Sequence, residues 1–307
     1  MYPIYFAPIQ GYTEDAFRRL HHELFGGVTA YYTPFIRLEH GEVRSKDKRD
    51  VRPEFNQEVN IVPQVLASGG KEFDTLLQFL LPLGYKHIDL NMGCPFPLQS
   101  RHGRGAGLLT HPDKVEEICQ VIRQHGDIDF SIKMRLGMED VNDWKQILPI
   151  LEDTPLKYIV LHPRTAIQQY KGTLHRDAFQ DFLAQSHHPI IYNGDITEVK
   201  QIQELEATYA DRLAGVMIGR GLLCRPSLAA EYATETSLPD QLLISRIKVF
   251  HDRLLAHYEN IIPGEAQRLN KIRTFWDYME PLLGRKAWKK IEKAGNLKNY
   301  LAAVRAL

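Results

Sequence analysis

Short apolar or β-branched runs alternate along the chain with longer segments of helical spacing. The short runs fall at residues 3–8, 29–34, 60–66, 86–91, 129–134, 157–162, 189–193 and 214–219. The segments between them repeat apolar residues three and four positions apart, as in Phe73, Leu76, Leu77 and Leu80, in Val115, Ile118, Cys119 and Ile122, and in Trp144, Ile147, Leu148 and Leu151. Parallel strands need crossover connections, and the helices supply them. Eight such units over about 230 residues predict a (β/α)8 TIM barrel of the α/β class.

A doubly wound open sheet is the alternative architecture. It needs a glycine-rich fingerprint after its first strand, and residues 7–11, Ala-Pro-Ile-Gln-Gly, do not provide one. After about residue 237 the strand pattern stops. One helical stripe then follows, with further helices expected at 264–280, 285–293 and 296–306; the stripe consists of Leu242, Leu243, Ile247, Phe250, Leu254 and Leu255. We therefore expect a barrel over residues 1–237 and a small helical domain over residues 238–307.

The composition narrows the class of protein. Of 307 residues, 44% are hydrophobic and 25% are charged, which is ordinary for a globular protein. No apolar run approaches the length that spans a bilayer, and the N-terminus lacks the basic region of a signal peptide. The three cysteines, Cys94, Cys119 and Cys224, are widely spaced and form no metal-ligand pattern. A cytoplasmic protein without a membrane segment or a bound metal is expected.

Charge is distributed unevenly along the chain, although the formal net charge is zero. Residues 241–307 hold 13 Lys and Arg against 6 Asp and Glu, and residues 1–240 hold the remaining 25 and 32. The C-terminal segment is therefore basic and the barrel segment acidic. Such asymmetry suggests a basic surface for a polyanion, and a solvated Lys-rich helical face is the alternative.

In a barrel of this kind the functional site lies at the carboxyl ends of the strands. The expected strands end at Pro8, Thr33, Gln64, Asn91, Lys133, His162, Asn193 and Gly219. Residues 87–95, His-Ile-Asp-Leu-Asn-Met-Gly-Cys-Pro, are the most informative stretch, because a buried strand there delivers Asn91 and Cys94 into a tight turn. A thiol beside a carboxamide can donate a proton to a group that the carboxamide holds.

Three further strand ends carry polar side chains suited to a ligand. Alternation in residues 130–135 turns Lys133 toward the barrel mouth, where its ammonium needs an anionic partner; a surface lysine is the alternative. His162 comes with Arg164 and Thr165, which favours ligand binding over a hydrogen-bonded core histidine. Gln64 offers an amide that can pair with the edge of a flat heterocycle.

The last two strand ends predict a phosphate site. Residues 193–196, Asn-Gly-Asp-Ile, follow the seventh strand, and residues 219–221, Gly-Arg-Gly, follow the eighth. Loops at these two places commonly bind phosphate in barrels through glycine backbone amides, and Arg220 can add a charge-assisted contact. A simple turn at each glycine is the alternative.

The chain resembles the tRNA-dihydrouridine synthases, and the resemblance extends over nearly all of it. The matching stretches are residues 7–13 through Phe17-Arg18, 89–95, 103–109, 133–137, 162–165 with Tyr170 and Gly172, 193–196 and 215–221. Among flavin barrels the Asn-x-Gly-Cys-Pro element at 91–95 is specific to this family. The family fold implied is an FMN-binding barrel followed by a helical tRNA-binding domain.

The resemblance also implies residue roles. Cys94 would be the proton donor, and Asn91, Arg164 and Thr165 would contact the substrate uridine. FMN would be held by Pro8, Ile9, Gln10, Gln64, Lys133, His162, Asn193, Gly194, Asp195, Gly219 and Arg220. Reduced FMN would deliver a hydride to C6 of the uracil, and NADPH or NADH would be the transient reductant. Cys94 would have to arrive as a thiol, because a thiolate cannot donate a proton.

The basic tail would bind tRNA phosphates and so help to draw the target base out of its stack. The candidates are Arg268, Lys271, Arg273, Arg285, Lys286, Lys289, Lys290 and Lys293, with Trp276 and Trp288 interleaved, although such tryptophans are more often helix core. A monomer is expected. Two other functions stay open: a flavin barrel that reduces a free pyrimidine or another small unsaturated substrate, and a non-redox RNA-binding module.

Overall fold

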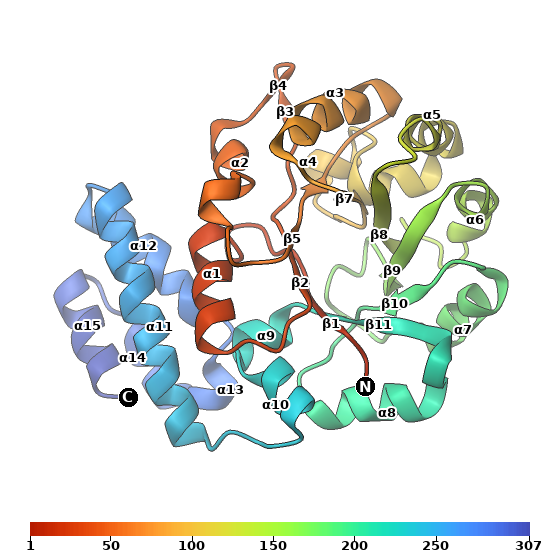
Figure 1. The fold of residues 1–307 in the computed structure, drawn as a ribbon. Helices are drawn as coiled ribbons and strands as arrows, with labels where there is room; N and C mark the ends of the chain where they lie inside the picture. The colour runs from red at the N-terminus through yellow and green to blue at the C-terminus, as the bar shows by residue number, and fades with distance from the viewer.

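The computed structural model describes residues 1–307 and contains a closed parallel β-barrel (Figure 1). Its strands are β1 (Ile4–Phe6), β2 (Ala30–Tyr32), β5 (Ile61–Val62), β6 (Gln64–Val65), β7 (His87–Met92), β8 (Asp129–Gly137), β9 (Leu156–Thr165), β10 (Ile190–Tyr192) and β11 (Leu213–Ile218). Around the sheet the order is β5-β2-β1-β11-β10-β9-β8-β7-β6. Each of the eight predicted apolar runs coincides at least in part with a strand, so the predicted barrel is confirmed.

The third predicted run, 60–66, closes the barrel. It is divided at Pro63 into β5, which pairs with β2, and β6, which pairs with β7. Proline has no backbone N–H and therefore interrupts the ladder. The Pro63 carbonyl still accepts a hydrogen bond from the Asp89 backbone N–H at 2.9 Å. One stretch of chain thus joins the two ends of the sheet order.

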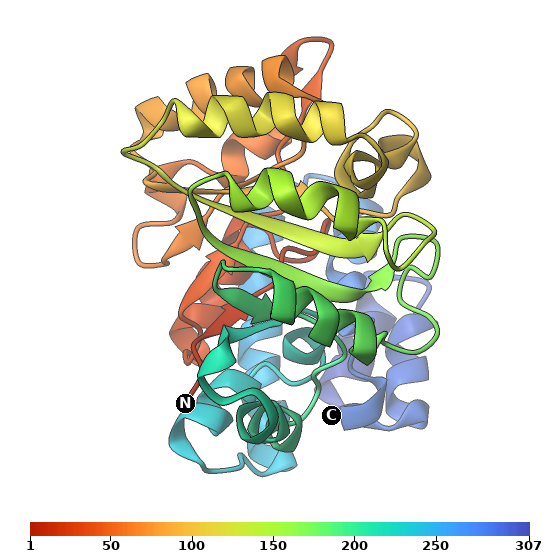
Figure 2. The same cartoon turned by 90° about the vertical axis from the view of Figure 1, so that its right-hand side faces the viewer.

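Helices cover the outside of the barrel. They are α1 (Asp15–Leu24), α3 (Gly70–Leu80), α5 (Pro112–Arg123), α6 (Trp144–Glu152), α7 (Arg176–Gln185), α8 (Val199–Tyr209), α9 (Arg220–Cys224) and α10 (Leu228–Thr234). Figure 2 shows α5, α6 and α7 lying across the outer face of the long strands β8 and β9. The apolar stripes predicted for α3, α5 and α6 are all buried.

Some short elements were not expected from the sequence. In place of a long helix after β2, the chain forms a hairpin of β3 (Leu38–Glu39) and β4 (Glu42–Val43) and then α2 (Ser45–Asp50). The turn after Cys94 contains α4 (Pro97–Ser100). Short 3-10 turns are η1 (Pro53–Phe55), η2 (Leu81–Leu83), η3 (Gly105–Thr110), η4 (Ala210–Arg212) and η5 (Thr274–Trp276).

Five helices follow the barrel: α11 (Asp240–Ile261), α12 (Glu265–Arg273), α13 (Glu280–Leu283), α14 (Arg285–Glu292) and α15 (Leu297–Arg305). The single helix predicted over 264–280 was wrong beyond Arg273. A continuous helix there would bring the Pro281 ring against the carbonyl of Asp277, and the chain instead turns through η5. Leu242, predicted for the buried stripe of α11, is 46% exposed. Trp276 is fully buried, in line with a core role.

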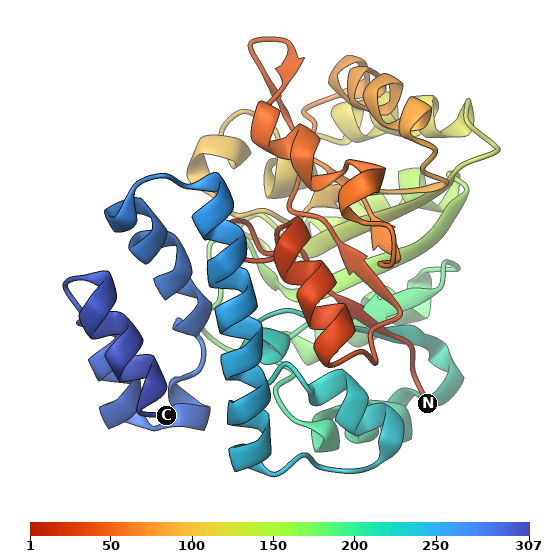
Figure 3. The ribbon, with the colours of Figure 1, turned by 60° about the vertical axis from the view of Figure 1, so that its left-hand side comes forward.

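The helical segment shares its core with the barrel. Figure 3 shows α11 side by side with α1. The ring centroids of Phe17 on α1 and Phe250 on α11 lie 4.8 Å apart, and one apolar cluster of 73 buried residues extends through both parts. The domain boundary at 237/238 stays a prediction, because residues on its two sides stabilise each other.

Candidate active site

A cavity of about 660 Å³ opens at the carboxyl ends of the barrel strands. The structure brings together there every residue predicted to hold the cofactor, along with Asn91 and Cys94: Pro8, Ile9, Gln10, Gln64, Asn91, Cys94, Lys133, His162, Asn193, Gly194, Asp195, Gly219 and Arg220. Further lining residues that were not predicted include Phe35, Arg135, Tyr170, Tyr278 and Pro281. The predicted substrate residues Arg164 and Thr165 are not part of the lining.

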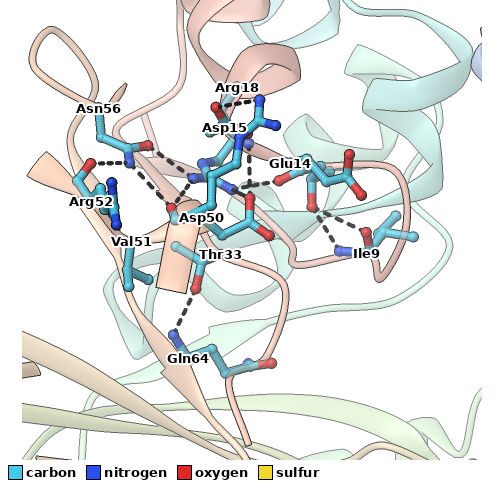
Figure 4. Close-up of polar contacts among 12 residues, drawn as sticks. Ile9, Glu14, Asp15, Arg18, Thr33, Asp50, Val51, Arg52, Asn56 and Gln64 are labelled. Carbon is cyan, nitrogen blue, oxygen red and sulfur yellow. Dashed lines mark hydrogen bonds and ion pairs between the residues drawn. The ribbon is translucent and has the colours of Figure 1, made fainter. Parts of the chain in front are cut away.

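The first loop of the cavity is held from behind by a buried arginine (Figure 4). The Ile9 backbone N–H donates to Thr13 Oγ1 at 2.9 Å, and the Thr13 carbonyl accepts from Arg18 Nη1 at 2.6 Å. The other terminal nitrogen of Arg18 donates to the Asp50 carbonyl at 2.6 Å and to Asn56 Oδ1 at 2.9 Å. Arg18 has no exposed surface. It therefore ties the loop that presents residues 8–10 to the last residue of α2 and to the segment that follows it.

Asn91 holds the loop that carries the thiol. Its Oδ1 accepts from the Gly93 N–H at 3.0 Å and from the Cys94 N–H at 2.8 Å. Burial raises the pKa of Cys94 above its usual value, against weaker opposing effects of a backbone hydrogen bond and of the charges of Arg135 and Lys133. The Cys94 side chain is therefore a thiol at neutral pH, which is the state that can donate a proton.

Two cations on β8 face the cavity. No hydrogen bond or ion pair within the chain engages the Lys133 ammonium, whereas Arg135 donates to the Gly93 carbonyl and to the Thr165 carbonyl, both at 2.9 Å. Burial, and then the charge of Arg135, lowers the pKa of Lys133 to about 8. Burial also lowers the pKa of Arg135 to about 10. Lys133 is thus a cation available to a ligand, and Arg135 joins the loops after β7 and β9.

His162, in the carboxyl-terminal half of β9, is neutral. Burial lowers its pKa well below the usual value, and the charges of Arg135 and Lys133 lower it further. Its ring stacks on that of Tyr170 with centroids 6.5 Å apart. A neutral imidazole can accept a hydrogen bond at one ring nitrogen while it donates at the other.

Asp195 is clamped between two arginines. Arg164 donates to both carboxylate oxygens, at 2.8 and 2.5 Å, and Arg220 donates to Oδ1 at 2.8 Å. The hydrogen bonds from Arg164 hold the pKa of Asp195 below its usual range. Asp195 also has a positive φ of 46°, an uncommon backbone conformation for a residue other than glycine. Arg164 is only 3% exposed, so it is better placed to orient Asp195 than to contact a substrate.

The predicted tRNA-binding residues divide into two groups. Lys271 bonds to the Gly11 carbonyl at 3.0 Å and to Glu14 at 2.8 Å, and Arg273 donates to the Ala294 carbonyl at 2.7 Å. These two stabilise contacts within the protein. The second group is accessible to solvent. Lys289 and Arg268 are partly exposed, and the exposed members lie on and just after α14: Arg285, Lys286, Lys290 and Lys293.

The chemistry of the cavity favours an anionic, carbonyl-bearing ligand. Lys133, Arg135 and Arg220 bring three positive charges to its lining, against the one carboxylate of Asp195. The amides of Gln64 and Asn91 add donors suited to a heterocycle. The fold and the site together define a (β/α)8-barrel enzyme with its ligand cavity at the strand ends.

The comparisons with known proteins identify the family. The dihydrouridine synthase (Dus) family model matches residues 5–305. A probable tRNA-dihydrouridine synthase of Helicobacter pylori is 31% identical over 86% of this chain and 78% of its own length. The tRNA-dihydrouridine synthase B of Escherichia coli is 29% identical over 89% of this chain and 86% of its own. The chain belongs to the dihydrouridine synthase family.

Solved structures agree in fold. Morphinone reductase superposes with a TM-score of 0.55 at 9% identity, over 77% of this chain and 87% of its own. Histamine dehydrogenase from Rhizobium superposes with a TM-score of 0.56 at 10% identity, over 76% of this chain and 45% of its own. At such low identity the likeness concerns the barrel fold alone.

No helix of this chain has the length and apolar character required to cross a bilayer.

Proposed function

We propose that this protein reduces the C5=C6 bond of a uridine in tRNA to dihydrouridine, with FMN as cofactor and NADPH or NADH as reductant. The observation that carries the proposal is the joint placement of a protonated thiol, Cys94, and an unpartnered ammonium, Lys133, in one cavity. Reduction of an activated alkene needs a hydride and a proton, and this cavity offers a protein proton donor beside a site for an anionic redox ring.

The residues present fit FMN. A flavin carries carbonyl oxygens and a ring N–H on its pyrimidine edge and a phosphate on its tail, and the cavity lining supplies donors for both ends. Gln64 and Lys133 would bind the pyrimidine edge, and Asn193, Gly194 and Arg220 would bind the phosphate. Gly219 leaves room beside Ile9, since a Cβ at position 219 would lie 3.3 Å from Ile9 Cδ1. When bound, the flavin supplies the hydride.

The protein's own groups would complete the reaction. Asn91 would hold the target uracil, and the Cys94 Sγ would deliver the proton to C5. Lys133 would stabilise negative charge on the reduced ring, because an ammonium in a site shielded from water acts strongly on nearby charge. His162, being neutral, would contribute hydrogen bonds without adding positive charge.

A tRNA substrate is supported by the surroundings of the cavity. The helical segment contributes Tyr278 and Pro281 to the lining, so the surface that carries the α14 cations adjoins the reaction site. Exposed apolar side chains lie in the two loops that Arg135 joins: Phe96 (54% exposed) and Leu98 (63%) after β7, and Ile167 (61%) and Tyr170 (55%) after β9. Unpaired RNA bases characteristically stack on aromatic side chains such as Phe96 and Tyr170.

The α14 cations give a prediction. The double variant Lys286→Glu/Lys290→Glu is expected to weaken tRNA binding by tenfold or more, because each phosphate contact contributes through counterion release, and to flatten its salt dependence. FMN affinity should not change. Lys86→Glu, a single charge reversal at the opposite end of the barrel, is the control. Equal tRNA affinity of the double variant and the control would contradict the assignment. Removal of residues 241–307 is a poorer test, because it would expose the shared core.

The function itself is tested by anaerobic spectroscopy. The purified protein is loaded with FMN and reduced with NADPH, and its visible absorbance is followed after addition of unmodified tRNA or of free uridine. We expect rapid reoxidation by tRNA and little by free uridine. Reoxidation by the free pyrimidine would instead indicate the small-molecule reductase, and failure to bind flavin would favour the RNA-binding module.

A further inference from the structure

A row of buried hydrogen bonds runs along the inside of the barrel to the thiol loop. Gln64 Nε2 donates to Asp89 Oδ2 at 2.7 Å, and Asn91 Nδ2 donates to Gln64 Oε1 at 2.7 Å. Asn91 Oδ1 in turn accepts the Gly93 and Cys94 N–H groups at 3.0 and 2.8 Å. We call these three side chains and the two backbone N–H groups the Asp89 relay. In every hydrogen bond of the relay, the acceptor is the group nearer to Asp89 and the donor is the group farther from it.

Asp89 is the acceptor that ends the relay. It is completely buried, and its other oxygen, Oδ1, accepts from Ser131 Oγ at 2.6 Å. His87 Nε2 lies 3.0 Å from the same Ser131 oxygen. A buried carboxylate is costly unless its oxygens are engaged, and apolar or tyrosine side chains fill the neighbouring interior of the barrel. The carboxylate at position 89 therefore calls for an explanation beyond packing.

The direction of the relay decides what Asn91 shows to the cavity. An amide oxygen has two lone pairs, and both lone pairs of Asn91 Oδ1 are taken by backbone N–H groups. One N–H of the Asn91 amide is taken by Gln64. The remaining N–H is the only hydrogen-bonding group that Asn91 can offer a ligand. An N–H donor pairs with the carbonyl oxygen at C4 of uracil, whereas the amino group at C4 of cytosine offers it no acceptor.

We propose that Asp89 is a positioning residue that, as the terminal acceptor of the relay, orients Gln64 and Asn91 so that Asn91 offers only a donor and thereby selects uracil against cytosine. The inference rests on the proposed function for the contact between Asn91 and the target base. The orientation of the relay itself is a property of the protein alone. The two parts are therefore tested separately.

The relay is tested by hydrogen exchange in the protein without substrate. Asp89→Leu removes the acceptor, and Asp89→Asn keeps an oxygen for Gln64 while its NH₂ faces Ser131. We expect deuterium uptake at Gly93 and Cys94 to quicken by tenfold or more in the leucine variant and to match wild type in the asparagine variant. Peptides from α5 and α6 should exchange as before. Unchanged uptake in the leucine variant, or equal loss of protection in both, would overturn the relay.

A swap variant tests the selectivity and does not depend on Asp89→Leu folding. Asn91→Asp alone sets carboxylates at both ends of the Gln64 amide and should lose protection at Gly93 and Cys94. Adding Asp89→Asn lets Gln64 turn over, which reverses the relay and should restore that protection. The double variant then offers the cavity an acceptor. No restoration of protection in the double variant would overturn the relay.

The selectivity is measured with tRNA that carries either uridine or cytidine at the target position. Affinity for the two tRNAs is compared in wild type and in the double variant, and we expect the preference for uridine to fall by tenfold or more. An unchanged preference beside restored protection would overturn the role in base selection while the relay stands. If wild-type protein does not reduce tRNA at all, the proposed function fails, and the exchange result still decides the relay.

Discussion

Replacement of Cys94 by alanine is expected to lower dihydrouridine formation by about 10²–10⁴-fold, the range that general acid catalysis contributes. The thiol lies in the cavity and burial keeps it protonated, so its loss removes the proposed proton donor at C5 of the uracil. FMN should still bind, because the proposed flavin contacts come from other residues. Dihydrouridine is measured in tRNA by mass spectrometry, and flavin content by visible absorbance.

Cys224 supplies a matched control for this experiment. It lies in α9 and also borders the cavity, and burial raises the pKa of its thiol as well. Cys224→Ala should keep most of the activity. Asn91 accepts a hydrogen bond from the backbone of Cys94 and so positions that residue, and it makes no such bond to Cys224. Wild-type turnover in a flavin-loaded Cys94→Ala variant would refute the assignment of Cys94. Equal losses in the two variants would point to packing of the cavity instead of proton transfer.

Replacement of Lys133 by methionine is expected to slow flavin reduction by roughly 10²-fold or more, the scale of losing one preorganised electrostatic contact in an active site. The methionine fills similar volume without the charge. The flavin potential should also fall, because the anionic reduced form loses its counterion. Stopped-flow reduction by NADPH and a dye-coupled potential titration measure the two effects.

The same lysine predicts a pH dependence. The free-enzyme pKa of Lys133 is lowered to about 8, so the ammonium is present below that pH and is lost as the pH rises through it. FMN affinity should therefore decline above about pH 8 in the wild type, and this decline should be absent in Lys133→Met. Identical pH profiles in the two proteins would contradict a role for this charge in binding the cofactor.

The local pattern was sufficient to predict the barrel. Each strand is a short apolar run that can be recognised without knowledge of its neighbours, and each helix on the outer face repeats buried residues at helical spacing. The parallel arrangement then follows from the alternation. The main exception has a local cause as well. The prediction of one helix over 264–280 did not take account of Pro281, which disrupts helical geometry in the turn before it.

The candidate site was predictable in part for the same reason. Residues at the ends of parallel strands must lie at one rim, so Asn91, Lys133 and His162 could be placed together from the strand pattern alone. The phosphate loops were predicted from their places after the last two strands, and the family resemblance added FMN as the ligand and uracil as the group that Cys94 would protonate. The positions of Arg164 and Thr165 outside the cavity lining could not be foreseen, because they depend on contacts with residues distant in the chain, such as the bond of Arg164 to Asp195.

The sequence by itself determined the element order, the rim on which the site lies, the family and the basic character of the C-terminal segment. Only the tertiary structure decided how the residues engage one another. The hydrogen bond between Asp89 and Gln64 depends on the register of β6 with β7, and the contribution of Tyr278 to the cavity depends on how the helical segment packs. Register and packing arise from contacts between residues far apart in the chain, which no local pattern records.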